Sequence, residues 1–183
     1  MLIFISGGVR SGKSSLGENL TLKLASARKV YLATAKPYDN EIKKRILKHQ
    51  FDRRNKGFFT IEKSEALEGI LPMLKKDDTI LLDCLGALLS NEIYGNLDQN
   101  LDDNFIISVK KNIFNSIVSI NSQVSNIIVI SNEIFSDGIV YDPSIEVYIK
   151  VLGELHQDIA SIADTVIECS FGNNIVHKGN LSM

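Results

Sequence analysis

The chain has 183 residues, of which 44% are hydrophobic and 23% are charged, and its net charge is −2. A chain of this length and composition can bury its own core, so it is neither a disordered protein nor one that needs disulfides to fold. The near-neutral charge excludes a strongly basic surface of the kind that binds duplex nucleic acid. The longest apolar runs are too short to span a bilayer, so we expect no membrane insertion.

The first residues and the two cysteines indicate in which cellular compartment the protein is expected. Met1 leads directly into an apolar run with no basic segment before it, so we expect no signal peptide. Cys84 and Cys169 lie in apolar, strand-like stretches and are typical of core thiols in a reducing compartment. The sequence therefore predicts a cytoplasmic protein.

Strand and helix patterns alternate along the chain. Short apolar runs predict buried strands at residues 2–5, 30–34, 58–61, 79–83 and 126–130. Apolar residues three or four apart predict helices at residues 16–24, 40–51, 64–74, around 88–89, 106–120 and 143–159. Ser64, Asp102 or Asp103, and Asp142 before Pro143 are suited to begin three of them.

The order of these elements predicts an α/β fold. Repeated strand–helix units with continuous apolar strands favour a mostly parallel sheet covered by helices on both faces. Residues 165–169 and 175–178, on either side of a glycine–asparagine pair, predict a C-terminal antiparallel hairpin. Residues 95–103 are polar and predict a loop. No repeat or linker divides the chain, so we expect one nucleotide-binding domain over residues 1–183.

The strongest motif follows the first strand and fully matches the phosphate-loop pattern G-x-x-x-x-G-K-[ST]. Its residues are Gly7, Gly8, Val9, Arg10, Ser11, Gly12, Lys13 and Ser14. Backbone N–H groups of such a loop surround phosphate oxygens, and the helix that follows adds a favourable dipole. We expect Lys13 to reach the β- and γ-phosphates and Ser14 to bind Mg²⁺. The alternative is a glycine-rich turn that only joins a strand to a helix.

Two carboxylates end buried strands. Asp83 ends the run at residues 79–83, where a carboxylate near a phosphate loop is placed to hold Mg²⁺ through water. Glu133 ends the run that begins at residue 126 and is a second candidate at the same edge of the sheet. The alternative for Asp83 is an ordinary strand-end or helix-capping residue.

A basic segment surrounds one histidine. His49 lies four residues from Arg45 and four from Arg53, so a helix would place all three on one side. Neighbouring cations lower the pKa of an imidazole, and a neutral imidazole is a nucleophile. The alternative is a core-facing stripe that His49 shares with Ile42 and Ile46. His156 and His177 lack such a setting, and we interpret both as structural.

The assembled motifs resemble the adenosylcobinamide kinase/adenosylcobinamide-phosphate guanylyltransferase family over nearly the whole chain. Residues 7–14 are similar to that family's G-G-x-R-S-G-K-S, and residues 31–34 to its Y-I-A-T. Residues 45–49 fit R-I-x-x-H, residues 131–133 fit S-N-E, and residues 153–157 fit G-x-x-x-Q.

The resemblance implies a RecA-like P-loop NTPase fold and two reactions on one corrinoid. A nucleoside triphosphate, ATP or GTP, phosphorylates adenosylcobinamide with Mg²⁺. GTP then transfers GMP through a guanylylated histidine, which matches His49, to give adenosylcobinamide-GDP. Lys13 is the other catalytic residue implied. The family's further guanine-nucleotide contacts match Ala33, Thr34, Ala35, Gln50, Phe51, Asp52, Arg53, Glu62 and Asp83. The family also implies a homotrimer.

Several positions depart from the family pattern. Gly86 stands where D-C-L-T has threonine, and Tyr141 where N-E-V-G-x-G-I-V-P has proline. Residues 148–150 read Y-I-K in place of F-R-D. These departures leave two alternatives open: a paralogue that kept only a kinase activity, and a nucleotide-binding regulator without catalysis.

Overall fold

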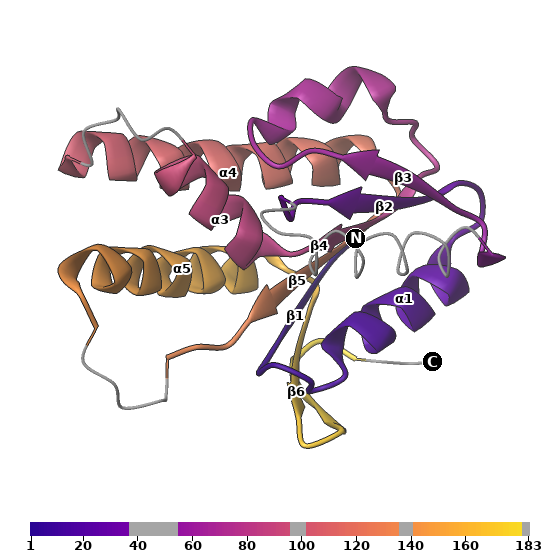
Figure 1. Cartoon of the computed structure of the whole chain (residues 1–183). Helices are drawn as coiled ribbons and strands as arrows, with labels where there is room; N and C mark the ends of the chain where they lie inside the picture. Colours follow the sequence, from indigo (N-terminus) through magenta and orange to yellow (C-terminus); the bar gives the residue numbers. More distant parts are fainter. Residues whose placement is uncertain (37–54, 96–101, 136–140, 181–183) are drawn as a thin grey trace.

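A computed structural model of the chain describes residues 1–36, 55–95, 102–135 and 141–180 (Figure 1). Its elements in chain order are β1 (Leu2–Gly7), α1 (Lys13–Leu24), β2 (Lys29–Ala33), β3 (Phe58–Glu62), the 3-10 helix η1 (Leu67–Met73), β4 (Thr79–Asp83), α3 (Leu85–Tyr94), α4 (Asp103–Gln123), β5 (Asn126–Asn132), α5 (Pro143–Ile162), β6 (Thr165–Ser170) and β7 (Asn173–Lys178). No helix in the described ranges is both long enough and apolar enough to cross a membrane.

The strands form one sheet in the order β3-β2-β4-β5-β1-β6-β7. Neighbouring strands pair in parallel from β3 to β6, and β7 pairs with β6 antiparallel. The predicted parallel sheet and its C-terminal hairpin are therefore confirmed. Parallel strands end at one edge of a sheet, so the residues that follow β1, β4 and β5 are brought to the same edge.

Helices cover both faces of the sheet, as predicted (Figure 1). Ile3 and Ile5 of β1 pack on the side of α1, whereas Leu2 and Phe4 pack on the side of α3, α4 and α5. Helix α1 comes very close to the sheet at Gly17, where an added Cβ would lie 2.7 Å from Cδ1 of Ile130. This close packing fixes the helix that follows the phosphate loop directly above the central strands.

Aspartates cap the N-termini of the two long helices, α4 and α5. The carboxylate of Asp102 accepts a hydrogen bond from the Phe105 N–H at 2.8 Å and caps α4. The carboxylate of Asp142 accepts one from the Ser144 N–H at 3.0 Å and caps α5, whose first residue is Pro143. Both predicted helix starts are confirmed, because each cap satisfies an N–H group that the helix leaves without a partner.

The helix expected after Ser64 is wrong in its start and its type. The structure has the 3-10 helix η1, which begins after Ala66, a residue in the left-handed region with φ 52°. Pro72 lies inside the segment, and proline lacks the N–H that the interior of any helix uses, so a long α-helix is disfavoured there. The apolar spacing was nevertheless correct, because Leu67 and Ile70 are buried. The helix predicted at residues 40–51 lies outside the described residues.

Candidate functional site

The phosphate loop has the expected strand–loop–helix setting. β1 ends at Gly7 and α1 begins at Lys13, and the Ser11 N–H closes the loop onto the Gly8 carbonyl at 3.2 Å. Gly12 precedes the helix with φ 95°, in the left-handed region that glycine adopts without strain. The N-terminus of α1, with its unpaired N–H groups, is therefore held at the loop, where an anion is favoured.

Lys13 is positioned across this loop. Its side chain is buried, with the residue only 8% exposed, and its ammonium donates to the Gly8 carbonyl at 3.0 Å. An ammonium group has three N–H donors, so this single contact leaves donors that a phosphate can use. The interpretation of residues 7–14 as a plain connecting turn does not explain why a lysine would be buried there.

Asp83 lies at the same edge of the sheet. In the strand register it stands level with Ile130 of β5 on one side and Ala33 of β2 on the other, and Ala33 stands level with Glu62 of β3. The Tyr31 hydroxyl donates to Oδ2 of Asp83 at 3.0 Å. The structure thus brings Ala33, Glu62 and Asp83, which the sequence only suggested as a group, into one row across three strands.

The residues present fit a magnesium ion that is bound together with a nucleotide. Ser14 is the second residue of α1 and Asp83 ends β4, and a hydroxyl and a carboxylate are the oxygen ligands that Mg²⁺ prefers. In the described ranges no group of three or more His, Cys, Asp or Glu side chains could hold a metal by itself. This donor set suits Mg²⁺, which is usually bound by one or two protein oxygens, phosphates and water.

A hydrogen-bond network that the sequence did not reveal ties β2 to β4. The Thr34 hydroxyl donates to the Cys84 carbonyl and accepts from the Cys84 N–H, both at 2.8 Å. The amide of Asn91 on α3 donates to the Thr34 carbonyl at 2.8 Å. Thr34 is fully buried, so its side chain holds the two strand ends in place, beside the carboxylate of Asp83.

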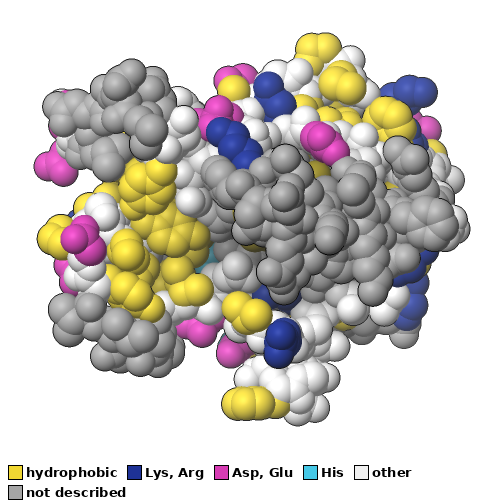
Figure 2. Space-filling model, viewed as in Figure 1, with side chains coloured by type: hydrophobic (Ala, Val, Ile, Leu, Met, Phe, Trp, Pro, Cys, Tyr) yellow, Lys and Arg dark blue, Asp and Glu magenta, His cyan; other side chains and the backbone are white. Residues whose placement is uncertain are grey.

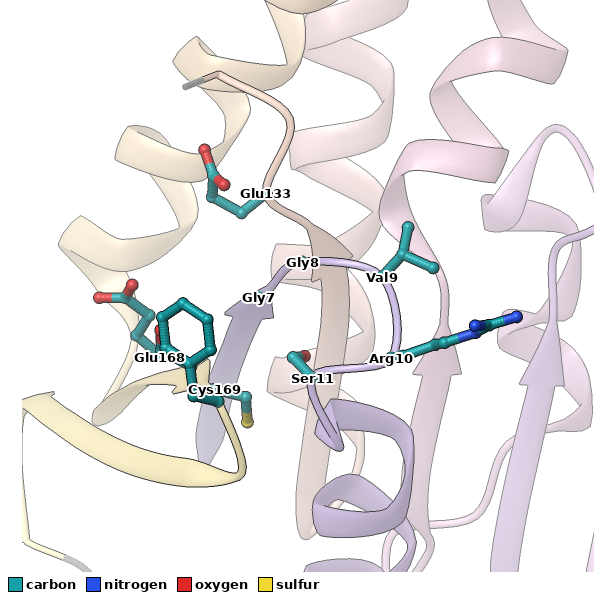
Figure 3. A pocket seen from close by; sticks show the side chains of 10 residues that line it. Gly7, Gly8, Val9, Arg10, Ser11, Glu133, Glu168 and Cys169 are labelled. Carbon is teal, nitrogen blue, oxygen red and sulfur yellow. The ribbon is translucent and has the colours of Figure 1, made fainter. Parts of the chain in front are cut away.

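A pocket of about 300 Å³ adjoins the phosphate loop on the side of the C-terminal hairpin (Figure 3). It is lined by Gly7, Gly8, Val9, Arg10, Ser11, Glu133, Glu168, Cys169, Ser170 and Phe171. The Glu133 N–H donates to the Gly7 carbonyl at 2.9 Å, which anchors the segment after β5 to the loop. The sequence had suggested Glu133 but gave no sign that Glu168 or Phe171 would join it, because their placement depends on how β6 pairs with β1.

His156 and His177 have the structural environments that the sequence predicted. The His156 Nε2 lies 2.7 Å from the Ser131 hydroxyl oxygen, and its ring makes edge contacts with Phe4 and Phe135 at 5.0 and 5.1 Å between centroids. Burial lowers the pKa of His156 to about 4, so the ring is neutral at pH 7. His177 lies in the exposed hairpin 2.8 Å from a carboxylate oxygen of Glu168.

Five expected site residues lie outside the described residues. They are His49, Gln50, Phe51, Asp52 and Arg53. Their roles therefore stay predictions.

Comparison with known proteins decides the family. The model of the cobinamide kinase/cobinamide phosphate guanyltransferase family matches residues 3–176. The chain belongs to this family. It is 27% identical to the bifunctional adenosylcobalamin biosynthesis protein CobU of Salmonella typhimurium over 91% of this chain and 93% of that protein. It is 31% identical to the bifunctional protein CobP of Pseudomonas aeruginosa over 88% of each.

This family consists of transferases that act on nucleotides and cobinamide. Among solved structures, the RadB recombinase superimposes over all of this chain and 82% of its own, with a TM-score of 0.52 and 10% identity. That likeness concerns the fold alone, and it confirms the expected RecA-like P-loop architecture.

Two departures from the family pattern are in contact with each other. The Tyr148 hydroxyl on α5 donates to the Gly86 carbonyl on α3 at 3.1 Å, and an added Cβ at Gly86 would lie 2.9 Å from the Tyr148 hydroxyl oxygen. The Tyr148 hydroxyl would therefore have to move if residue 86 were the threonine of the family's D-C-L-T. Tyr148 supplies a hydroxyl near the place where Gly86 lacks one.

Proposed function

We propose that the protein is a bifunctional enzyme that phosphorylates adenosylcobinamide and then converts the product to adenosylcobinamide-GDP. The observation that carries this proposal is the lysine-bearing phosphate loop with Asp83 at the same sheet edge, in a member of this family. ATP or GTP serves the first reaction and GTP serves the second.

In the first reaction the loop binds the triphosphate and Lys13 stabilises negative charge on its β- and γ-phosphates. The aminopropanol hydroxyl of the corrinoid attacks the γ-phosphorus, the bond to the β-phosphate oxygen breaks, and the nucleoside diphosphate leaves. Ser14 and Asp83 would hold Mg²⁺, which neutralises charge on the phosphates when it is bound. The hydroxyl proton passes to solvent.

In the second reaction a nitrogen of the His49 imidazole attacks the α-phosphorus of GTP, and pyrophosphate leaves. A phosphate oxygen of the corrinoid phosphate then attacks the same phosphorus, so the GMP group moves to the corrinoid and the imidazole is regenerated. The basic residues around His49 support this role, because cations favour the neutral nucleophilic ring and also bind phosphate. Ala33, Glu62 and Gln50 to Arg53 are the proposed guanine-nucleotide contacts.

We further propose a homotrimer. Figure 2 shows hydrophobic side chains gathered at the left of this face, over the region of α3 and α5. Tyr94, Phe135, Ile145 and Val147 are each between 36% and 42% exposed. Large apolar side chains exposed together are typical of a surface that another chain or a ligand covers, and this supports an interface between copies.

The test of guanylyl transfer uses GTP labelled on the α-phosphate, Mg²⁺ and the purified chain beside a His49→Ala variant. Acid-labile label on the unaltered chain, and none on the variant, is the expected result. Equal label on both proteins would place the intermediate on another residue. No label on either, despite measurable GTP binding, would refute the transferase half and leave a kinase or a nucleotide-binding regulator.

A further inference from the structure

The pocket beside the phosphate loop extends from Glu133, after β5, across the end of β1 to the C-terminal hairpin, and its hairpin wall lies on the opposite side of β1 from Asp83. In the sheet order β4 stands two strands from β1, beyond β5, whereas β6 is the neighbour of β1 on its other side. If Asp83 and Lys13 lie at the terminal phosphate of a bound nucleotide, its α-phosphate and nucleoside extend from the loop in the direction away from β4. The pocket lined by residues 168–171 of the hairpin lies on that side.

The charges of this pocket oppose a phosphate. Glu133 and Glu168 lie on one side of the Gly7–Gly8 backbone, whereas the side chains of Val9 and Arg10 point to the other side (Figure 3). Two carboxylates repel phosphate oxygens but accept hydrogen bonds from N–H and O–H groups. The pocket is therefore suited to the uncharged part of a ligand whose phosphates stay in the loop.

Both carboxylates are held in place by the protein. Oε2 of Glu168 lies 2.8 Å from Nε2 of His177, on the neighbouring strand β7. Oε1 of Glu133 accepts a hydrogen bond from the Phe135 N–H at 2.8 Å. A carboxylate with one oxygen fixed in this way presents its second oxygen in a defined direction, which favours recognition of a ligand donor.

Phe171 supplies an aromatic face at the rim of the same pocket. It lies at the turn between β6 and β7, with φ 50°, and its side chain is 99% exposed. An exposed phenylalanine contributes nothing to the packed core, yet this one stands beside a site for phosphates. Aromatic side chains stack on nucleobases with little dependence on the identity of the base.

We propose that this pocket binds the nucleoside of the triphosphate that the loop holds for the kinase reaction, with Phe171 stacked on the base and Glu168 accepting a hydrogen bond from a base N–H or a ribose hydroxyl, whereas Ala33 and Glu62 contact the GTP of the second reaction. The proposal rests on the proposed function, because it requires that the loop binds a nucleotide. A volume of about 300 Å³ is at the lower end of the range for ligand pockets, roughly 300–1,000 Å³.

The test compares two probes by isothermal titration of the full chain with Mg²⁺: β,γ-imido-ATP, which has a nucleoside, and tripolyphosphate, which has none. We expect Phe171→Ala to weaken binding of β,γ-imido-ATP roughly 5- to 150-fold, the range for loss of one base–aromatic stack. Its affinity for tripolyphosphate should not change. Ile107→Ala, which removes a 63% exposed apolar side chain on α4, is the matched control and should change neither affinity.

Glu168→Ala should also weaken only the nucleotide. If its effect disappears with the 2′-deoxy form of the probe, the carboxylate binds the ribose; if the effect persists, it binds the base or the 3′-hydroxyl. Unchanged affinity of Phe171→Ala for β,γ-imido-ATP would overturn the proposal. Tripolyphosphate binding as tightly as the nucleotide to the unaltered chain would also overturn it, while leaving the loop's proposed role intact. If the unaltered chain bound neither probe, the kinase proposal itself would fail.

Discussion

His156 makes the stability of this fold depend on pH, and the effect can be worked out from its surroundings. The ring is buried beside Phe4 and Phe135 with Ser131 as its hydrogen-bond partner, and burial lowers its pKa from 6.5 to about 4. In the unfolded chain the ring takes up a proton near pH 6.5. In the folded chain it stays neutral until the pH approaches 4. The unfolding free energy is therefore unaffected by His156 above pH 6.5, and it decreases as the pH falls from 6.5 towards 4, because only the unfolded chain binds the proton there.

The size follows from the two pKa values. Each pH unit between them is worth about 1.4 kcal/mol, so lowering the pH from 7 to 5 should cost about 2 kcal/mol of unfolding free energy through His156 alone. A His156→Gln variant removes this titration while it keeps a hydrogen-bonding group near Ser131. The difference in stability between the variant and the unaltered chain should therefore change by about 2 kcal/mol between pH 7 and pH 5.

Urea unfolding followed by circular dichroism at pH 7, 6 and 5 measures this difference. A His156→Leu variant should show the same weakened pH dependence, but with about 1 kcal/mol less stability at pH 7, because the Ser131 hydroxyl loses its partner. If both variants lost stability with falling pH as steeply as the unaltered chain, the ring would titrate normally in the fold. The inference from its burial would then be wrong.

Three further predictions concern a helix–helix contact, a buried ion pair and an exposed apolar surface. Gly86→Thr should destabilise the fold by about 1–3 kcal/mol through its clash with Tyr148. Adding Tyr148→Phe should recover part of that loss. Thermal unfolding of the single and double variants measures the coupling between the two positions, and additive effects would contradict the contact. Asp78→Ala should cost about 3 kcal/mol in urea unfolding, because it leaves Arg28 without the buried carboxylate that binds both its Nε and its Nη2; a loss below 1 kcal/mol would contradict this. Ile145→Lys should lower the mass measured by sedimentation, if the patch on α5 is the interface between copies, whereas an unchanged trimer would place that interface elsewhere.

Asp78 also shows what makes a buried carboxylate tolerable. Its burial alone would raise its pKa, but hydrogen bonds from Arg28 and from the Lys75 N–H lower the pKa below its ordinary range. Nothing in the sequence around Asp78 predicted this pair, because its members lie 50 residues apart. The parallel strands were predictable, since their apolar runs are continuous and the residues between them have helical spacing.

The element that the sequence misjudged has a local cause. Residues 64–74 have helical spacing, yet the segment is a 3-10 helix that begins only after the left-handed Ala66 and contains Pro72, which disfavours a long α-helix. Apolar periodicity reports which side chains are buried, and Leu67, Ile70 and Leu74 are indeed buried. It does not report the hydrogen-bond pattern of the backbone, which the proline restricts.

The site was predictable where its residues are adjacent in the sequence. Residues 7–14 form a local motif, and the structure places Lys13 in the loop as expected. The Thr34–Cys84 contact and the pocket formed by Glu133, Glu168 and Phe171 join distant segments through the sheet register. Such neighbours follow from strand order, and a single sequence with several apolar strands of similar length does not determine that order.

The most direct test of bifunctionality is to incubate the chain with adenosylcobinamide, GTP and Mg²⁺ and to follow the corrinoid products by mass spectrometry. We expect adenosylcobinamide phosphate to appear first and adenosylcobinamide-GDP to follow. Lys13→Ala should form neither product from adenosylcobinamide, and His49→Ala should stop at the phosphate. A corrinoid that remains unmodified with the unaltered chain would contradict the account, and formation of the GDP product by His49→Ala would contradict the role assigned to that histidine.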